Sequence, residues 1–482
     1  MYLLLTVLAV QQPAPPPASP VSDTAHVVIV ATTDVHGRVL GWDYVRDAAA
    51  PGGLSRAATM VETLRAQYPE QVVLVDAGDL IEGNLFAAYF AERDSQRPHP
   101  VVDALNAMQY DAATPGNHEF DFGTAVLARA TGDATYHYVS ANIFKGAGDT
   151  LVYPPHVVVT RGGVKIGITG FTTPGVMVWD RSQLGGRIRV RPIAEAAPPA
   201  MRRLDLAGVD LKVVLIHCGL NEPSSYDTAG VGAENAALGL ASIPLPAPRP
   251  DLVIVGHSHK EMRDYVVNGV HFVQPRNFAL SLAVVHVSLV KEAGAYRVVS
   301  MRPELIPLAT VGEQPRFVRR FSAAHERART WAATPLGTAG PGFSARYGRV
   351  EDTPLLDFIN EMQRRRAGAD LSAAADFDLS AGLPEGEVRE RDVSGVYPFE
   401  NTLRAVRISG SQLRAYLEQS ARYFRTYQPG TPLINDSVPG FNFDVVSGVT
   451  YTIDLTQAPG QRIRGLAFRG RPSPRRTASR WR

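Results

Sequence analysis

Five short blocks within the first 260 residues contain four histidines, two aspartates and one asparagine whose types and spacing suit metal binding. The blocks read TTDVHG (32–37), DAGDLIEGN (76–84), TPGNHEFDFG (114–123), LIHCGL (215–220) and VGHSHK (255–260). Their candidate metal ligands are Asp34, His36, Asp79, Asn117, His217, His257 and His259. Oxygen and imidazole ligands without a thiolate suit Mn²⁺, Fe, Co²⁺ or Zn²⁺ in a catalytic site better than they suit structural zinc.

The size of this ligand set indicates two divalent cations rather than one. Seven ligands exceed a single tetrahedral site, but they suit two cations that share a bridging carboxylate. Two cations about 3.5–4 Å apart can clamp the attacking and leaving oxygens of a displacement at phosphorus, and they generate hydroxide near neutral pH. Asp34 and His36 are two residues apart, as are His257 and His259. In an extended backbone that spacing places both side chains of a pair on the same side.

Each block by itself also has a purely structural interpretation. Asn and Asp suit turns, Gly-Asn pairs often mark them, and the histidines of VGHSHK can lie on the surface. Their joint occurrence, each after an apolar run, favours metal chemistry. The chain contains no nucleophile elbow and no phosphate-cradling Walker loop that would suggest another mechanism.

The elements that position these blocks alternate between strands and helices. Strand-like apolar runs are expected at 26–34, 71–79, 163–171, 211–219 and 251–259, and helical periodicity at 54–68 and 100–108. This alternation predicts a layered α/β domain, with a hairpin turned at Gly162–Gly163 that makes the sheet mixed. Open α/β sheets bind ligands beyond the carboxyl ends of their strands, so the blocks are expected to converge on one edge.

The length of 482 residues predicts two domains. A signal-like apolar segment with a Pro-rich tether (1–25) predicts export to the periplasm or the extracellular space. A catalytic domain (26–310), a linker helix and loop (311–345) and a smaller α/β domain (346–482) are expected to follow. The smaller domain has helical patterns at 353–366 and 409–424, and strands are expected near 403–408 and 443–454.

Composition narrows the classes of partner. The net charge of +2 gives no reason to expect a nucleic-acid polymer as partner. No run of residues is long and apolar enough for a membrane span. The single cysteine, Cys218, excludes an intramolecular disulfide.

In this order the five blocks resemble those of the calcineurin-like metallophosphoesterases, and GNHEFDFG together with GHSH resembles the 5′-nucleotidase branch. The resemblance implies a four-layer αββα sandwich followed by a smaller α/β domain that holds the nucleotide. It implies that Asp79 bridges two divalent cations, one of them also held by Asp34, His36 and His259, the other by Asn117, His217 and His257.

The histidine and the second aspartate of TPGNHEFDFG resemble the catalytic dyad of that family. In this comparison His118 stabilises charge or protonates the leaving oxygen, and Asp121 orients it. Two nearby dications are expected to lower the pKa of His118, and a hydrogen bond from its ring to the carboxylate of Asp121 is expected to restore its basicity.

The segment GVYPFENTLRAVRISGSQLRAYLE (395–418) resembles the nucleotide-binding segment of the family. This implies that Phe399 stacks on the base, a contact worth about 1–3 kcal/mol; alternatively, Phe399 is a core residue. PFENTL and PGFNFDVVSGVTYTIDL (439–455) are more similar to the branch of 2′,3′-cyclic-nucleotide 2′-phosphodiesterases/3′-nucleotidases. The end, SPRRTASRWR, departs from the family's continuation, which brings a second stacking aromatic, and resembles a truncated or out-of-frame end.

Together these features predict an exported dinuclear-metal phosphohydrolase that releases phosphate from nucleotides by direct attack of metal-bound hydroxide. Activity as a 2′,3′-cyclic-nucleotide phosphodiesterase/3′-nucleotidase is expected first. The alternatives are a 5′-nucleotidase/UDP-sugar hydrolase, or a non-catalytic nucleotide-binding protein disabled by its shortened second domain.

Overall fold

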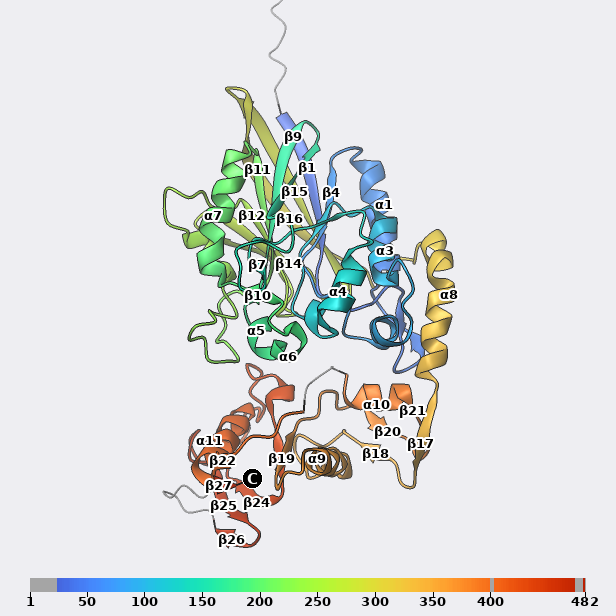
Figure 1. Cartoon of the computed structure of the whole chain (residues 1–482), viewed down its shortest axis with the longest axis vertical. Coiled ribbons are helices and arrows are strands. Elements are labelled where there is room, and N and C mark those ends of the chain that lie inside the picture. Colours follow the sequence, from blue (N-terminus) through green and yellow to red (C-terminus); the bar gives the residue numbers. More distant parts are fainter. Residues whose placement is uncertain (1–23, 399–402, 473–479, 482) are drawn as a thin grey trace, which may run out of the picture.

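The computed structural model describes residues 24–398, 403–472 and 480–481. Figure 1 shows two bodies, a larger one coloured from blue to yellow and a smaller one in orange and red. The signal-like segment predicted at 1–25 lies almost wholly outside the described residues, so export stays a prediction. No helix in the described part of the chain is long and apolar enough to cross a bilayer.

The first sheet of the larger body is mixed, because β1 pairs in parallel with β4 and antiparallel with β15. Its six strands are, in spatial order, β16 (Ala295–Pro307), β15 (Ser281–Glu292), β1 (Thr24–Thr32), β4 (Val72–Asp76), β5 (Ala112–Ala113) and β6 (His137–Tyr138).

The second sheet contains the predicted hairpin, in which β8 and β9 run antiparallel on either side of Gly162–Gly163. Its strand order is β13 (Met262–Val267), β14 (Val270–Gln274), β12 (Leu252–Val255), β11 (Leu211–His217), β9 (Val164–Thr172) and β8 (His156–Arg161).

The two sheets pack face to face between two layers of helices. Alternate side chains of β1 divide between two cores: Val27 and Ile29 face the second sheet, while Val28 and Val30 face helices. On that outer face lie α1 (Leu54–Gln67), α3 (Pro100–Met108) and α8 (Pro315–Ala332), whereas α7 (Ile193–Leu206) covers the second sheet. The predicted four-layer αββα sandwich is confirmed.

Short elements occupy the connections of the larger body. They are β2 (Trp42–Asp43), β3 (Ala48–Ala49), α2 (Leu85–Ala88), α4 (Gly123–Thr131), β7 (Ile143–Lys145), α5 (Val176–Trp179), α6 (Arg181–Leu184) and β10 (Ile188–Val190). Figure 1 shows α5 and α6 at the end of the sandwich that faces the smaller body.

The smaller body combines helices with short strand pairs. Its helices are α9 (Pro354–Ala367), α10 (Glu390–Val396) and α11 (Gly410–Ser420). The strands are β17 (Pro335–Ala339), β18 (Phe343–Ser344), β19 (Ser372–Ala374), β20 (Gly382–Leu383), β21 (Gly386–Arg389), β22 (Ile408–Ser409), β23 (Val445–Ser447), β24 (Val449–Ile453), β25 (Ile463–Phe468), β26 (Arg471–Pro472) and β27 (Arg480–Trp481).

The strand predicted near 403–408 is wrong over most of its length. Residues 403–407 are exposed and have no strand assignment, and only Ile408 and Ser409 pair, with β27. Among the described residues no strand lies beside 403–407 to receive its backbone hydrogen bonds, which explains the irregular conformation.

The predicted linker helix packs as part of the larger body. Phe317, Phe321 and Ala328 of α8 are buried in the core that this helix shares with the first sheet. Asp47 of the larger body accepts a hydrogen bond from Arg329 of α8 at 2.8 Å and pairs with Arg391 of α10 at 3.0 Å. The domain boundaries expected from the sequence stay a prediction.

Candidate active site

The predicted metal ligands gather where strands of both sheets end. Asp34 follows β1, Asp79 follows β4, Asn117 follows β5, and His217 is the last residue of β11. His257 follows β12, so two separate sheets contribute to one site. Asp34, His36, Asp79, Asn117 and His217 are buried, His257 is half-buried, and His259 is exposed. The five sequence blocks therefore converge on one edge of the sheets, as expected.

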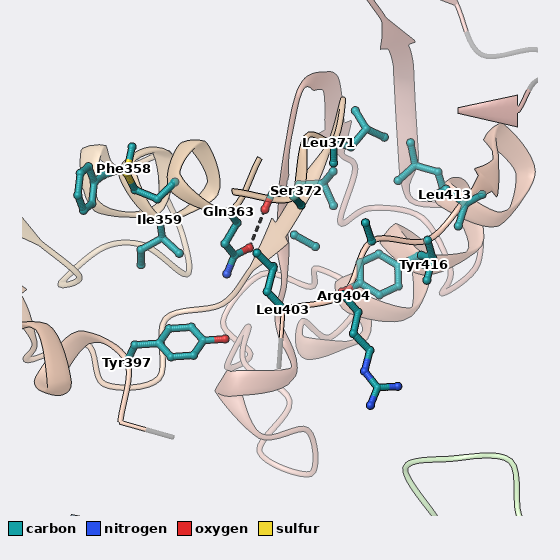
Figure 2. A pocket seen from close by; sticks show the side chains of 18 of the residues that line it. Phe358, Ile359, Gln363, Leu371, Ser372, Tyr397, Leu403, Arg404, Leu413 and Tyr416 are labelled. Atoms are coloured by element: carbon teal, nitrogen blue, oxygen red, sulfur yellow. Dashed lines mark hydrogen bonds between the residues drawn. The ribbon is translucent and has the colours of Figure 1, made fainter. Parts of the chain in front are cut away.

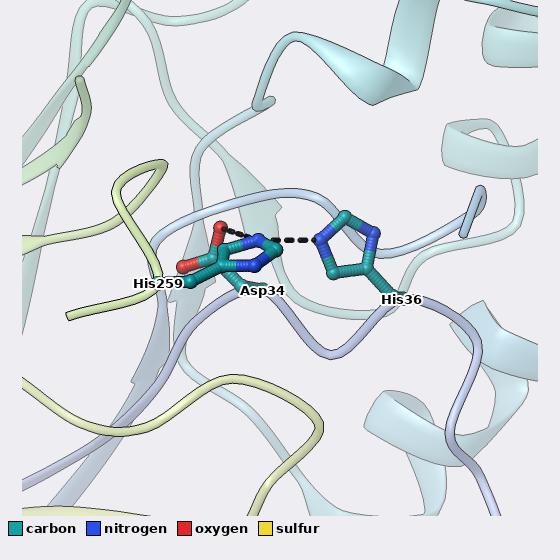
Figure 3. Close-up of side chains that lie close together, drawn as sticks. All are labelled: Asp34, His36 and His259. Atoms are coloured by element: carbon teal, nitrogen blue, oxygen red, sulfur yellow. Dashed lines mark hydrogen bonds and ion pairs between the residues drawn. The ribbon is translucent and has the colours of Figure 1, made fainter. Parts of the chain in front are cut away.

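One group of ligands joins the first and last blocks. Nε2 of His36 lies 3.0 Å from Nε2 of His259, which in turn lies 3.4 Å from Oδ1 of Asp34 (Figure 3). Two imidazole nitrogens and a carboxylate oxygen therefore point toward one small volume. Such a group has the size and the donors to hold a cation.

Asp79 connects this group to the second one. Its Oδ2 lies 2.9 Å from Nε2 of His217 and 3.8 Å from Nε2 of His36. On the far side Oδ1 of Asn117 lies 2.8 Å from Nδ1 of His257. All seven predicted ligands thus lie in one continuous cluster, with Asp79 between its halves.

The backbone of the cluster differs from the extended form that the two-residue spacing suggested. Five predicted ligands have a left-handed backbone: Asp34 (φ 51°), His36 (47°), Asp79 (60°), His257 (74°) and His259 (52°). The paired side chains therefore meet because the chain turns sharply after each strand. Left-handed conformations are uncommon outside glycine, and such strain concentrates at functional sites.

Two glycines make room for the ligand side chains. A Cβ on Gly116 would stand 2.1 Å from Oδ1 of Asp79, and one on Gly83 would stand 2.3 Å from Nδ1 of His36. Gly83 also has a φ of 110°, which disfavours any other residue. The close packing of these loops on the ligands depends on both positions.

Burial and mutual charge shift the ionisation of the ligands. Burial by itself raises the pKa of Asp34, but the hydrogen bond with His259 and the charge of His217 lower it to about 2. Burial lowers the pKa of His36 to about 4. For His217 burial acts in the same direction, yet Asp79 raises the pKa to about 9. The carboxylate of Asp34 thus stays ionised and His36 stays neutral near pH 7, as metal ligands require, whereas His217 must release a proton when a cation binds.

The donor set fits divalent cations on a further observation. Nε2 of His217 is buried and makes no hydrogen bond with any described residue, although it lies beside Oδ2 of Asp79. A buried polar atom without a hydrogen bond needs an explanation, and a bound ion is one of the usual ones. Carboxylate, imidazole and amide donors are what a catalytic transition-metal site offers.

The predicted dyad is present beside the cluster. Nδ1 of His118 lies 2.7 Å from Oδ2 of Asp121, and its backbone N–H donates to Oδ1 of Asp79 at 2.9 Å. Burial lowers the pKa of His118, but Asp79, Glu82 and Asp121 raise it well above its ordinary value. The restoring effect expected from Asp121 is therefore one of several in the same direction.

Four residues of the site carried no signal in the sequence that assigned them a role. Oε2 of Glu82 lies 3.1 Å from Nδ1 of His118, and Oε1 of Glu234 lies 3.1 Å from Nε2 of His257. Trp179 stacks on the ring of His257, and burial together with Asp121 raises the pKa of Asp180 to about 8. Trp179 is the last residue of α5, and the other three lie in connections whose approach to the site is set by the fold. Glu119 accepts a hydrogen bond from the backbone N–H of Asp79 at 2.9 Å.

A separate cavity of about 970 Å³ opens in the smaller body between α9, α10 and α11 (Figure 2). Its wall includes Phe358, Tyr397, Leu403 and Arg404, and none of the predicted metal ligands lines it. Phe399, predicted to stack on a base, lies outside the described residues, between two lining residues in the sequence. Its role stays a prediction.

Comparison with known proteins bears on both bodies. Residues 27–261 match the calcineurin-like phosphoesterase family, and residues 332–472 match the 5′-nucleotidase C-terminal domain. The chain is 30% identical to a 2′,3′-cyclic-nucleotide 2′-phosphodiesterase/3′-nucleotidase of Haemophilus influenzae, over 92% of this chain and 77% of that protein. It is 27% identical to the trifunctional nucleotide phosphoesterase protein YfkN of Bacillus subtilis, over 97% of this chain but only 36% of that protein.

The fold is similar to solved structures as well. A candidate 5′-nucleotidase of Staphylococcus aureus, crystallised with alpha-ketoglutarate, superposes with a TM-score of 0.80 at 25% identity. The match covers 95% of this chain and 89% of that chain. The chain therefore belongs to the calcineurin-like phosphoesterase family, with a 5′-nucleotidase C-terminal domain, and is a hydrolase of phosphoester bonds.

Proposed function

We propose that this protein is a dinuclear-metal phosphohydrolase of nucleotides. Its main activities would be those of a 2′,3′-cyclic-nucleotide phosphodiesterase and a 3′-nucleotidase. The observation that carries the proposal is the position of Asp79. Its Oδ2 faces His36 at 3.8 Å and His217 at 2.9 Å, so one buried carboxylate serves imidazoles from both halves of the cluster. A bridging carboxylate is what two adjacent cations need.

The seven ligands divide between two cation sites that share Asp79. The residues Asp34, His36 and His259 complete one site, and Asn117, His217 and His257 complete the other. When bound, divalent cations supply Lewis acidity to a phosphate oxygen and to an attacking water. The chain itself contributes fixed positions, because these side chains stand on turns that follow buried strands.

His118 donates a proton to the leaving oxygen. Asp121 holds the Nδ1 side of the ring at 2.7 Å, and its carboxylate raises the pKa of the ring and so favours the protonated form. Nε2 then carries a proton that it can pass to the departing oxygen. Glu82, 3.1 Å from Nδ1, adds a second negative group that favours the charged ring.

The names of the relatives and the chemistry of the leaving group support the proposed substrate class. The Haemophilus relative is named for both reactions on the 2′,3′ side of the ribose. Opening a cyclic 2′,3′-phosphate releases one secondary ribose oxygen, and hydrolysis of the resulting 3′-phosphate releases its neighbour. One proton donor placed beside the phosphate can therefore serve both steps.

A comparison of nucleotides tests this assignment. Phosphate release and ring opening are measured on 2′,3′-cAMP, 3′-AMP and 5′-AMP with Mn²⁺-loaded protein, next to His118→Ala. We expect kcat/KM for the first two substrates to exceed that for 5′-AMP at least tenfold, and all turnover to fall in the variant. The 5′-nucleotidase match of residues 332–472 favours 5′-AMP as the second candidate substrate. A preference for 5′-AMP with negligible cyclic turnover would make that activity the correct one.

A further inference from the structure

The ring of His257 is held on several sides. Its Nδ1 lies 2.8 Å from Oδ1 of Asn117, a predicted ligand of the same cation. Its Nε2 lies 3.1 Å from Oε1 of Glu234. The indole of Trp179 stacks on the ring with centroids 5.8 Å apart and planes at 26°, and His217 meets it edge-on. The ring is thus oriented so that Nδ1, and not Nε2, faces the cluster.

Glu234 is itself fixed in place, although it lies in the long loop between β11 and β12. Its Oε2 accepts the backbone N–H of Ser225 at 2.6 Å, and its own N–H donates to Oγ of Ser224 at 3.0 Å. Its carbonyl accepts a hydrogen bond from Thr173 at 3.1 Å, and only 8% of the residue is exposed. With Oε2 and the backbone engaged, Oε1 stays directed at His257.

The other three histidines of the cluster are held from the opposite side of the ring. In each of them Nε2 faces the carboxylates, and Nδ1 meets a neutral group of the described chain. For His36 and His217 this group is a backbone carbonyl, of Glu82 (2.9 Å) and of Ala77 (2.7 Å). For His259 it is the side-chain amide nitrogen of Asn277 (3.3 Å), which is a donor.

A neutral imidazole has one protonated and one unprotonated nitrogen, and the hydrogen bond at one nitrogen decides which is which. A carbonyl at Nδ1 keeps the proton there and leaves Nε2 for a cation. His257 faces the cluster with Nδ1, so it needs the reverse tautomer, with the proton on Nε2. An acceptor beside Nε2 supplies that, and a carboxylate also makes the ligand nitrogen more basic.

From this geometry we infer that Glu234 is the positioning residue of His257: it holds the proton on Nε2 and presents Nδ1 to a divalent cation. The inference rests on the cation sites of the proposed function and assigns to this loop carboxylate a role in cation affinity. Removing a group that orients a metal ligand typically weakens metal binding about 10–100-fold.

The test measures cation affinity without any substrate. Zn²⁺ is titrated in competition with an indicator dye into the full-length wild type, Glu234→Gln and Glu234→Ala. Asp227→Asn is the matched control, because it removes one carboxylate from the same loop at an exposed position that caps only the N–H of Ala229. We expect one class of zinc site to weaken about 10–100-fold in both Glu234 variants and to stay unchanged in the control. Equal zinc affinity in wild type and Glu234→Ala would overturn the inference.

A spectroscopic readout on the wild type remains decisive if the variants fold poorly. Ring ¹⁵N NMR of the zinc-loaded protein, with the His257 signals identified by their loss in His257→Gln, reports which nitrogen carries the proton. A proton on Nε2 with zinc on Nδ1 agrees with the inference, and the opposite pattern contradicts it. Neither measurement uses a nucleotide. If the protein binds zinc in this way but hydrolyses no nucleotide, the proposed function is refuted and this inference stands.

Discussion

Nδ1 of His118 lies 2.7 Å from Oδ2 of Asp121, three residues further along one tight turn. Side chains three apart on such a turn face each other, so this contact is built into the local sequence. The dyad therefore needs no distant element to bring its members together. What the rest of the fold supplies is the surrounding charge: Asp79 and Glu82 approach the same imidazole from another loop.

Replacing His118 by Asn tests its role in moving a proton. His118→Asn is expected to lower kcat about 10²–10⁴-fold, the usual contribution of a general acid, while the bound cation content stays the same. Asp121→Asn is expected to lower kcat less and to shift the alkaline limb of the pH–rate profile to lower pH, because the imidazole of His118 loses a partner that raises its pKa. His137→Asn, which replaces an exposed histidine, is the control and should retain the wild-type kcat. Loss of cations in His118→Asn would mean that this residue is a ligand instead.

The contact of Gly116 with Asp79 predicts a strong steric effect. In Gly116→Ala the new Cβ would stand 2.1 Å from Oδ1 and 2.5 Å from the backbone nitrogen of Asp79, so the carboxylate must move. A displacement of this size at a catalytic group is expected to lower kcat/KM about 10²-fold. Gly239→Ala, which adds a methyl group in open space, should behave as wild type. Wild-type kinetics in Gly116→Ala would show that the position of Asp79 is not critical.

The buried His99 predicts a loss of stability in acid. Burial, with the nearby charge of Arg129, lowers the pKa of His99 to about 3. Between this pKa and the ordinary value of 6.5, His99 binds a proton in the unfolded chain but not in the folded chain. The contribution of neutral His99 to the free energy of unfolding is therefore fully present above pH 6.5 and is lost as the pH drops. At pH 5 this loss amounts to about 2 kcal/mol.

His99→Asn checks that prediction. Asn can still cap the helix that follows, as the Nδ1 of His99 does for the N–H of Val101, but it does not titrate. Denaturant unfolding of chelator-treated protein at pH 7.5 and pH 5 gives the free energy of unfolding at each pH. We expect the drop between the two pH values to be about 2 kcal/mol smaller in His99→Asn than in wild type or in His137→Asn. An identical drop in all three proteins would contradict the assignment.

Local patterns in the sequence predicted the layered α/β domain and located the candidate ligands at the ends of strands, and the four-layer arrangement followed from the resemblance to a known family. Runs such as 26–34 alternate between two buried faces, and each ligand directly follows such a run. The left-handed backbone of five candidate ligands was not predicted, because Asp and His residues rarely adopt this conformation. The five are Asp34, His36, Asp79, His257 and His259. Tertiary packing of the loops imposes that conformation.

Residues that act across long sequence distances were also beyond a reading of local patterns. Glu234 reaches His257 through a loop with no periodicity, and its AENAAL context suggests only a short helix. The irregular 403–407 segment failed as a strand because pairing depends on a neighbour, which the residues themselves do not reveal. The candidate ligands could be selected from the sequence because they stand at the ends of strands, whereas their supporting contacts come from distant loops and could not.

The central claim is that seven side chains from two sheets build a two-cation hydrolytic site, and one titration tests it most directly. Chelator-stripped protein is reloaded with Mn²⁺ while p-nitrophenol release from bis-p-nitrophenyl phosphate is followed, in wild type, Asn117→Ala and the exposed-loop control Asn268→Ala. We predict no turnover in the stripped protein and a maximal rate at about two equivalents of Mn²⁺. Of the two variants, only Asn117→Ala should lose activity, by about 10²-fold. Undiminished turnover in the stripped protein, or in Asn117→Ala, would contradict the account.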